Sequence, residues 1–373
     1  MKKLIIVLTL LMPVLTFAQT NHSHTLGRVI KFPDIEGYKT IKTDLHMHSV
    51  FSDGNVWPTI RVQEALMDGL DAISLTEHIE YQPHKADIPH PDRNRAHEIA
   101  LAEAKNHDLI IIRGSEITRA MPPGHNNAIF LSDANKLLLK DSVESFREAK
   151  RQNAFVFWNH PNWTWQRKDG IAQMTEMHRN LIREKMLHGI EVVNDQTYSD
   201  EALQIALDNN LTIMGTSDVH GLIDWDFTGP KVSHRPVTLV FAKEKNEDGI
   251  KDGLFNRRTV VYFKNLLIGR NEFLQPLIQA SLVIKRAVYS DKSNVLTVEL
   301  ENKTNNEFIL RNKSVYNFHN INDVVVIKPG DGNIIEVKTR QRITEGKLAF
   351  EVMNAVNAPA SHPTLTWNFK VQP

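Results

Sequence analysis

The stretch that decides the fold runs from Thr43 to Gly54 and reads TDLHMHSVFSDG. It continues an apolar run that begins at Ile41 and places His46 and His48 two residues apart. Side chains at positions i and i+2 of a strand point the same way, so the two imidazoles project together. Such a pair can bind one metal ion, but two structural histidines in a packed core would give the same pattern. The stretch alone leaves both alternatives open.

Short polar segments of the same kind recur beside other apolar runs. They are Thr76-Glu77-His78, Gly114-Ser115-Glu116, Gly124-His125, Asn159-His160-Pro161 and Thr216-Ser217-Asp218-Val219-His220. In α/β barrels the carboxyl ends of the strands converge on one face, where binding sites are built. Charged groups gathered there must be paired or must hold metal. The recurrence therefore favours a metal site over a packed core.

Strand-like and helix-like runs alternate from residue 41 to residue 220. Apolar runs predict strands over Ile41–His46, Ala72–Leu75, Leu109–Ile112, Asn127–Leu131, Phe155–Trp158, Gly189–Val193 and Leu211–Gly215. Amphipathic stretches predict helices over Trp57–Asp68, Arg93–Asn106, Ser142–Gln152, Gly170–Leu187 and Asp200–Asn209. Seven strands in this alternation predict an α/β barrel, with an open doubly wound sheet as the alternative.

The pattern changes after Asp252, where Arg258–Phe263 is one more apolar run. Beyond Ser281 only short β-like runs occur, over Leu282–Tyr289, Asn294–Leu300, Phe308–Leu310, Val324–Ile327, Ile334–Lys338, Leu348–Val352 and Leu365–Val371. Asn, Asp, Gly and Pro separate them, which is typical of a small β-sandwich. We therefore expect a barrel over residues 19–275 and a β-sandwich domain over residues 276–373.

The first 18 residues have the pattern of a cleaved secretory signal peptide. A basic start, Met1-Lys2-Lys3, precedes an apolar run from Leu4 to Phe17, and small residues stand at Thr16 and Ala18. The run is too short to span a bilayer, and a buried or anchoring helix is the alternative. We expect an exported protein, periplasmic or secreted, with no integral membrane segment in the mature chain.

Composition limits the possible chemistry. The 373 residues contain 44 Lys and Arg against 44 Asp and Glu, so there is no basic footprint for nucleic acid. There are no cysteines, which excludes disulfides, thiolate metal sites and a cysteine nucleophile. The 17 histidines are concentrated before residue 235. Any metal must therefore be held by nitrogen and oxygen ligands.

The motifs in this order resemble those of the PHP (polymerase and histidinol phosphatase) superfamily. They are DLHMHS with SDG, then TEH, SE, GH, NHP and SDVH, over roughly residues 40–270. The resemblance implies a distorted (β/α)7 TIM-like barrel, two or three divalent ions and hydrolysis of phosphate esters. A barrel behind a signal peptide and before a β-domain is also similar to secreted bacterial PHP phosphodiesterases.

The resemblance implies nine metal ligands. They form three sets, which are His46, His48, Glu116 and Asp218 for one ion, Glu116 as a bridge with His125 and His160 for a second, and Asp53, His78 and His220 for a third. Asp53 stands where some members have histidine, and Glu77 stands where aspartate is commoner. A set of His, Asp and Glu suits manganese, zinc or iron(II) without separating them.

Further residues are candidates for contact with the substrate. They are Arg119, Trp165, Lys231 and His234, with Trp163, Trp225 and Arg235 as weaker candidates. Arg119 is able to bind phosphate bidentately, although a surface arginine is an equal alternative. Six other histidines are not assigned to the site. His84, His90 and His97 are expected to be surface or loop groups, and His107, His178 and His188 are expected to be structural. No general acid can be named.

The sequence therefore predicts an exported metal-dependent hydrolase that cleaves phosphodiesters by attack of a metal-bound hydroxide. Glu116, Asp218 and Arg119 are its expected catalytic residues, and a small-molecule phosphate ester is its expected partner. A phosphomonoesterase is the first alternative, but a monoester carries about two negative charges at neutral pH and few cations are in view. A C–N or carboxyl ester hydrolase and a non-catalytic metal-binding protein are the others.

Overall fold

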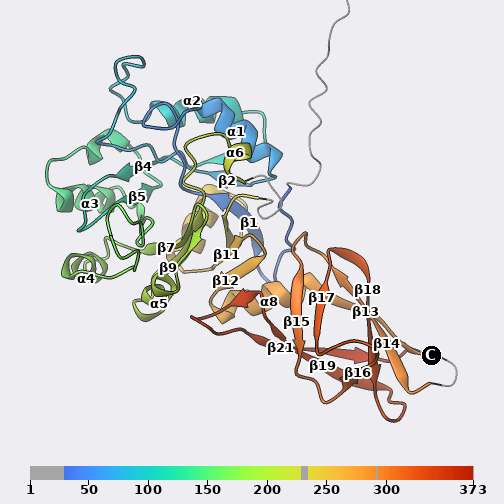
Figure 1. Ribbon diagram of the computed structural model, residues 1–373. Coiled ribbons are helices and arrows are strands. Elements are labelled where there is room, and N and C mark those ends of the chain that lie inside the picture. Colours follow the sequence, from blue (N-terminus) through green and yellow to red (C-terminus); the bar gives the residue numbers. More distant parts are fainter. Residues whose placement is uncertain (1–28, 228–233, 291–292, 373) are drawn as a thin grey trace, which may run out of the picture.

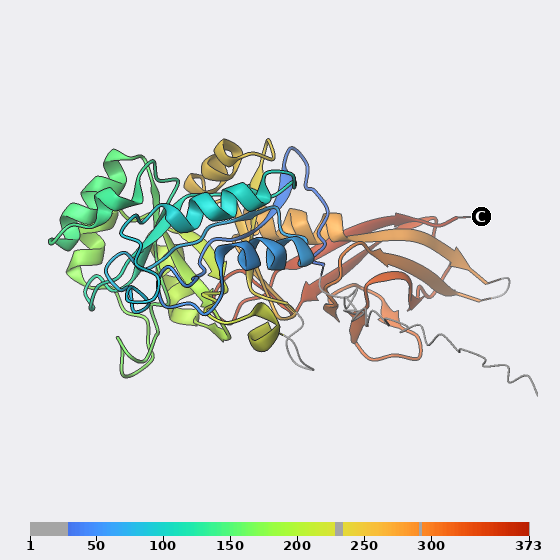
Figure 2. The same cartoon turned by 90° about the horizontal axis from the view of Figure 1, so that it is seen from above.

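The computed structural model describes residues 29–227, 234–290 and 293–372. A mixed α/β region and a β-sandwich lie end to end and give the molecule an elongated shape (Figures 1 and 2). The expected signal peptide and Lys231 lie outside the described residues. Within them, no helix combines the length and the apolar character needed to cross a membrane.

The first sheet of the α/β region has seven strands in the order β20-β12-β11-β10-β1-β2-β3. Their bounds are β1 Lys39–Asp44, β2 Ala72–Ile73, β3 Ile110–Ile111, β10 Val237–Ala242, β11 Thr259–Phe263, β12 Leu266–Gly269 and β20 Ala355–Val356. Strands β1, β2 and β3 are parallel, whereas β1, β10, β11 and β12 pair antiparallel. The sheet is therefore mixed.

The second sheet follows the path β4-β5-β6-β7-β8, with β9 also paired to β7. Their bounds are β4 Gly114–Ile117, β5 Asn126–Ile129, β6 Phe155–Trp158, β7 Gly189–Asn194, β8 Thr197–Tyr198 and β9 Thr212–Thr216. Strands β6, β7 and β9 run parallel, and β4, β5 and β6 pair antiparallel. Four of the five expected polar segments lie in or next to strands of this sheet.

Two seams join these sheets. At the β4 edge of the second sheet, an isolated bridge links His78, which follows β2, with Glu116. At the opposite edge, Met47 is bridged to Val219, which follows β9. At this same edge, Thr259 of β11 donates a hydrogen bond to the carbonyl of Ile213 in β9, at 2.8 Å. The bridges bring the polar segments of both sheets to one place.

Helices cover the outer faces of the sheets (Figure 1). They are α1 Pro58–Met67, α2 Arg95–Ala104, the short 3₁₀ helix η1 Ala134–Leu137, α3 Ser142–Arg151, α4 Glu176–Arg183, α5 Asp200–Asp208, α6 Ile223–Phe227, α7 Glu247–Phe255 and α8 Asn271–Ser281. Pro58 opens α1, where its missing N–H is not needed. The Asp141 side chain accepts hydrogen bonds from the Val143 and Glu144 N–H groups and caps α3.

The seven predicted strands all occur, but the pairing differs from a uniform parallel barrel. Strands β4, β8, β10 and β12 add antiparallel pairs that the sequence analysis did not assign. The hydrogen bonds form two sheets rather than one closed ring, so the (β/α)7 barrel stays a prediction. The helix expected over residues 170–187 is shorter, because the backbone enters α4 only at Glu176, after the capping residue Thr175.

The C-terminal part is a β-sandwich, as predicted. One sheet has the order β13-β14-β18-β16 and the other β17-β15-β19-β21. The bounds are β13 Leu282–Tyr289, β14 Val295–Asn302, β15 Phe308–Asn312, β16 Asn317–Phe318, β17 Val324–Ile327, β18 Gly330–Lys338, β19 Glu345–Val352 and β21 Thr364–Lys370. Alternate residues of β14 are buried, as a strand with one face on a core requires.

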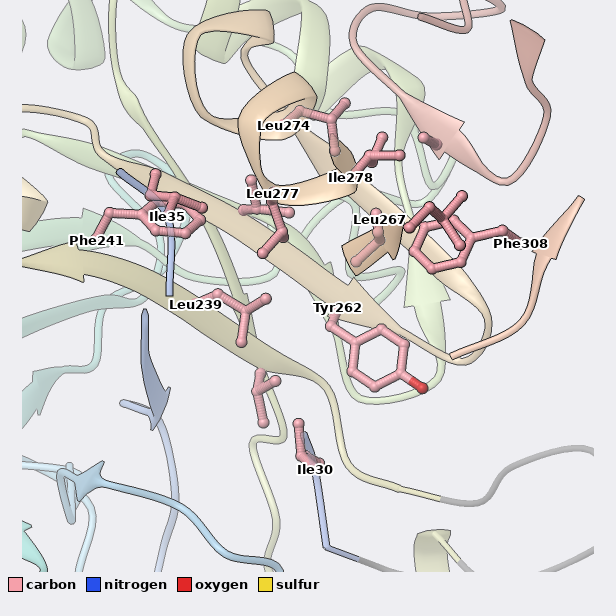
Figure 3. Packing of buried hydrophobic residues seen from close by; sticks show 14 of the residues in the cluster. Ile30, Ile35, Leu239, Phe241, Tyr262, Leu267, Leu274, Leu277, Ile278 and Phe308 are labelled. Carbon is pink, nitrogen blue, oxygen red and sulfur yellow. The ribbon is translucent and has the colours of Figure 1, made fainter. Parts of the chain in front are cut away.

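The two parts share one apolar core. Leu277 and Ile278 of α8 belong to the same cluster as Tyr262 of β11 and Phe308 of the sandwich (Figure 3), and all four side chains are buried. Strand β20 belongs to the sandwich segment in sequence but pairs with β12 of the first sheet. The expected boundary after residue 275 falls inside α8, so this helix belongs to the junction.

Candidate metal centre

The nine predicted ligands lie together at the seam between the two sheets. In the first set, His46 Nε2 is 3.0 Å from Glu116 Oε2 and 3.0 Å from Asp218 Oδ1. His48 Nε2 is 3.5 Å and 3.2 Å from the same two oxygen atoms. The two imidazoles of the opening stretch therefore project together, as their spacing predicts.

The second carboxylate oxygen of Glu116 faces other imidazoles. Its Oε1 lies 2.6 Å from His125 Nδ1 and 3.1 Å from His78 Nδ1. His160 is further out, with Nε2 3.9 Å from Asp218 Oδ2. The two oxygen atoms of Glu116 thus face different imidazoles, as those of a carboxylate shared by two ions would. His78 joins His125 in the second group more closely than the predicted His160 does.

The third set surrounds Asp53. His78 Nε2 lies 3.3 Å from Asp53 Oδ2, and His220 Nε2 lies 3.2 Å from Asp53 Oδ1. His48 Nδ1 is 3.7 Å from the same Oδ1. These ligand atoms form a group tight enough to hold one ion. The replacement of histidine by Asp53 therefore leaves the third group intact.

The donor atoms fit divalent ions better than they fit each other. His125 Nδ1 and Glu116 Oε1 are in contact, but their geometry is not that of a hydrogen bond. Asp53 Oδ1 is also buried without a hydrogen-bond partner. Atoms that point at a common ion show this arrangement. His160 and Asp218 also adopt left-handed backbone conformations, with φ of 29° and 51°, which is costly away from functional sites.

Glu191 supports this centre, and the sequence analysis did not identify it. Its Oε1 accepts hydrogen bonds from His46 Nδ1 at 2.8 Å and Thr216 Oγ1 at 2.5 Å. Its Oε2 accepts from the His160 backbone N–H at 2.7 Å and from Asn194 Nδ2 at 2.9 Å. The proton on His46 Nδ1 leaves Nε2 free to bind an ion. The sequence feature that could have identified Glu191 is its position as the one carboxylate in the otherwise apolar run of β7.

Glu77 holds the loop that follows His48. Its carboxylate accepts hydrogen bonds from Ser49 Oγ and Ser52 Oγ, both at 2.5 Å, and Ser52 Oγ also lies 3.2 Å from His48 Nδ1. The loop is so tight that only glycine fits at position 54, since a Cβ there would lie 2.7 Å from the His48 carbonyl carbon. The SDG motif therefore places Asp53 beside the second histidine.

Two buried arginines brace the strand ends. Arg61 of α1 donates to the carbonyls of His48 and Val219, at 2.9 Å and 3.2 Å. Arg235 pairs with Asp44 at 3.1 Å and with Asp68 at 2.7 Å. Each contact joins segments far apart in sequence, which fixes the ligand-bearing loops relative to one another.

Opposite charges dominate the protonation of the centre. Burial acts to lower the pKa of His78, but Glu116 and Asp53 outweigh it and raise the pKa to about 11. Burial acts to raise the pKa of Asp218, but the neighbouring histidines hold this pKa well below its usual range. The pKa of Glu116 is lowered in the same way by His78 and His125, against the effect of burial. In the absence of metal, protonated imidazoles balance the negative charge of the carboxylates. Binding of metal cations would therefore displace these protons.

A cavity of about 500 Å³ opens above these ligands. It is lined by Asp53, His78, His125, His160, Asn162, Trp163, Thr164, Gly170, Asn194, Asp195, Thr197, Asp218 and His220. The ring of Trp163 lies 5.0 Å from that of His160, between centroids. Among the lining residues that the structure describes there is no lysine or arginine.

The structure does not bring Arg119 or His234 to this cavity. The guanidinium of Arg119 pairs with Glu80 at 2.8 Å and donates to two backbone carbonyls. His234 is buried, and its two ring nitrogens contact the carbonyls of Arg235 and Lys264 at 2.7 Å each. Both side chains are already engaged elsewhere, which corrects their predicted contact with the substrate. Arg235 is likewise engaged in its ion pairs.

The tryptophans differ in position. Trp163 lines the cavity, and Trp165 stands next to it with ring centroids 6.4 Å apart and 85% of its surface exposed. Trp225 is 70% exposed on α6 and does not line the cavity. The predicted aromatic wall therefore consists of Trp163, with Trp165 at its outer edge.

His178 and His188 are structural, as expected. His97 and His107 differ from expectation, because His97 is buried on α2 and His107 is exposed. Burial lowers the pKa of His97, His178 and His188 to about 4 in each case, so all three rings are neutral at pH 7. His178 stacks on Trp158 with centroids 3.9 Å apart. Their role is packing.

Comparison with known proteins gives the family. The chain is 45% identical, with a TM-score of 0.85, to the crystal structure of a two-domain protein from Bacteroides vulgatus ATCC 8482 that contains a predicted PHP-like metal-dependent phosphoesterase. The match covers 91% of this chain and 98% of that one. Residues 282–368 match the family model of an Ig-like domain. No curated protein matches the chain.

Other solved structures are much less similar to this chain. The histidinol phosphate phosphatase of Lactococcus lactis subsp. lactis Il1403, complexed with zinc, L-histidinol and phosphate, is 18% identical with a TM-score of 0.28. That match covers 48% of this chain and 87% of the other. The extended likeness to the Bacteroides protein is sufficient: the chain belongs to the PHP superfamily of metal-dependent phosphoesterases.

Proposed function

We propose that the protein is an exported phosphodiesterase with two or three divalent ions, manganese, zinc or iron(II), in the centre described above. The observation that carries this proposal is the position of Glu116, whose two carboxylate oxygens face separate groups of imidazoles. Divalent ions held by these residues would supply a strong nucleophile near neutral pH and would polarise the phosphoryl group.

The chain's own residues set up the reaction. Glu116 and Asp218 hold the imidazoles around the centre, and Glu191 fixes the tautomer of His46. Trp163 and the polar residues opposite it enclose the substrate beside these ligands. In the reaction, the oxygen of a water bonds to phosphorus, one ester P–O bond breaks, and the released alcohol takes a proton.

A diester fits the cavity better than a monoester. A diester carries about one negative charge and a monoester about two at neutral pH. Monoester sites need more positive charge, yet the described lining residues include no lysine or arginine, and Arg119 is paired with Glu80. The charge of the cavity therefore favours the diester.

Metal dependence tests the reaction class. Protein stripped by a chelator should lose hydrolysis of bis(4-nitrophenyl) phosphate and regain it with manganese, zinc or iron(II). Glu116→Gln should reduce kcat by about 100-fold or more, whereas His84→Ala, at a residue outside the cavity lining, should leave it nearly unchanged. A reloaded, folded protein without any phosphoesterase activity would contradict the proposal.

Two further parts of the proposal concern export and fold. A basic start and a short apolar run support cleavage after residue 18, and N-terminal sequencing of the protein from the periplasm or medium tests it. The two seams between the sheets support a distorted (β/α)7 barrel, since they bring β9 against β10 and β11. A full-length amino terminus on exported material would contradict signal cleavage.

A further inference from the structure

The cavity has an aromatic wall directly beside the metal ligands. The indole of Trp163 packs with centroid distances of 5.0 Å to His160 and 5.5 Å to His125, and 40% of Trp163 stays exposed. Trp165 extends this wall outward at 6.4 Å. A phosphorus atom at the centre therefore places one of its ester groups against an indole face.

The wall contributed by β7 and β8 is acidic. Asp195, in the turn between these strands, lines the cavity but belongs to none of the ligand groups. Within the part of the chain that the structure describes, no lysine or arginine pairs with its carboxylate. Asp195 is an exposed residue of this lining. Asp195 therefore offers a ligand in the cavity a carboxylate that has no basic partner among the described residues.

These two walls suit an organic cation. An aromatic face attracts a cation by about 0.5–2 kcal/mol, and tryptophan does so best. A carboxylate without a cationic partner adds a charge attraction at the same place. A volume of about 500 Å³ lies in the lower range for ligand pockets, so a small diester that fills it contacts both walls.

We propose that the substrate is a phosphodiester in which one alcohol carries a quaternary ammonium or similar organic cation, held between Trp163 and Asp195. This inference rests on the phosphodiesterase function proposed above. A neutral apolar or aromatic alcohol would use the indole wall alone and would leave Asp195 without a partner. A second phosphate on the alcohol would meet Asp195 with no lysine or arginine among the described lining residues to balance it.

A pair of esters with the same shape separates charge from size. One is 4-nitrophenyl phosphocholine, and the other is 4-nitrophenyl 3,3-dimethylbutyl phosphate, in which carbon replaces the charged nitrogen. The manganese-loaded enzyme should hydrolyse the choline ester with a kcat/KM about tenfold higher, the size of one cation–π contact with a carboxylate. Equal values, or a preference for the neutral ester, would overturn the inference.

Substitutions locate the preference. Asp195→Asn should reduce the ratio of the two kcat/KM values several-fold, whereas Glu176→Gln removes one negative charge at an exposed site of α4, outside the cavity lining, and should keep the ratio. Trp165→Leu, at an exposed position that folding tolerates, should lower the ratio less than Asp195→Asn. An unchanged ratio in folded Asp195→Asn would overturn the inference.

The outcomes also separate this inference from the function on which it rests. If bis(4-nitrophenyl) phosphate is hydrolysed and the choline ester is not, the phosphodiesterase stands and the cation site is wrong. If no phosphodiester is hydrolysed by the reloaded enzyme, the proposed function fails, and the substrate inference fails with it.

Discussion

At the scale of single residues, Glu191 shows how a carboxylate without a ligand role sets the geometry of the centre. It accepts four hydrogen bonds, two of which come from His46 Nδ1 and the His160 backbone. Both contacts orient predicted ligands. A neutral amide at this position has an N–H group where a lone pair is needed, so at least one contact is lost.

We therefore expect Glu191→Gln to weaken manganese binding by about 10–100-fold, the usual effect of removing a partner of a metal ligand. Titration of the chelator-stripped protein, followed by calorimetry or by the spectrum of free manganese, measures this. Glu176→Gln makes the same change at an exposed site of α4 and serves as the control. Equal affinities in all three proteins would contradict the role of Glu191.

His97 predicts a pH dependence of stability. Its pKa is lowered to about 4, mainly by burial and also by Arg113, so the folded state keeps the ring neutral. The unfolded chain binds a proton below pH ~6.5. Because the unfolded state then holds more protons, this contribution to stability is full above pH ~6.5 and is lost progressively as the pH falls towards 4.

Metal-free His97→Gln should therefore lose stability less steeply than the metal-free wild type over this window. The difference in slope should approach one proton, or about 1.4 kcal/mol per pH unit. Urea unfolding at several pH values measures the slopes. His107→Gln, at an exposed histidine, should match the wild type. Parallel slopes for His97→Gln and the wild type would contradict the burial argument.

At the scale of elements, the cap of α3 offers a separate test. Asp141 accepts hydrogen bonds from the N–H groups of Val143 and Glu144, at 2.7 Å and 3.2 Å. Asp141→Ala leaves both donors unpaired and should lower the free energy of unfolding by about 1 kcal/mol, whereas Asp141→Asn should retain most of it. Equal losses in denaturant unfolding would show that the cap does not stabilise the helix.

Apolar runs were sufficient to predict most strands but not their partners. Strand β6 was predicted over its full length, because Phe155–Trp158 is a buried apolar run. Strand β4, Gly114–Ile117, was not assigned, because it contains Ser115 and the predicted ligand Glu116 and therefore lacks an apolar run. Antiparallel pairing of β1 with β10 depends on a contact about 200 residues away in sequence, which no local pattern encodes.

The metal centre was predicted better than the substrate side. Ligands such as His46 and Glu116 stand in short ordered motifs, and the structure brings these predicted ligands together. Arg119 and His234 were chosen by charge and position in sequence alone. Their side chains turn to Glu80 and to backbone carbonyls, and only the tertiary structure shows this.

At the scale of the whole molecule, the sandwich and the α/β region should unfold together. Phe308 of the sandwich is fully buried in the cluster that includes Leu277 of α8. Phe308→Ala should lower stability by about 3–5 kcal/mol, within one cooperative transition. Ile334→Ala, at a side chain that is 59% exposed, should change it by less than about 0.5 kcal/mol.

Calorimetry of metal-loaded protein measures both substitutions. A single transition that moves to lower temperature in Phe308→Ala supports the shared core. Two transitions, of which only one moves, would mean that the sandwich folds independently and that α8 does not couple it to the α/β region.

The most direct test of the central claim compares two substrates on the manganese-loaded enzyme. They are bis(4-nitrophenyl) phosphate and 4-nitrophenyl phosphate, each measured as kcat/KM with a metal-free control. The cavity, with no lysine or arginine among its described lining residues, predicts a strong preference for the diester. A preference for the monoester would contradict the account and would assign the same metal centre to a phosphatase.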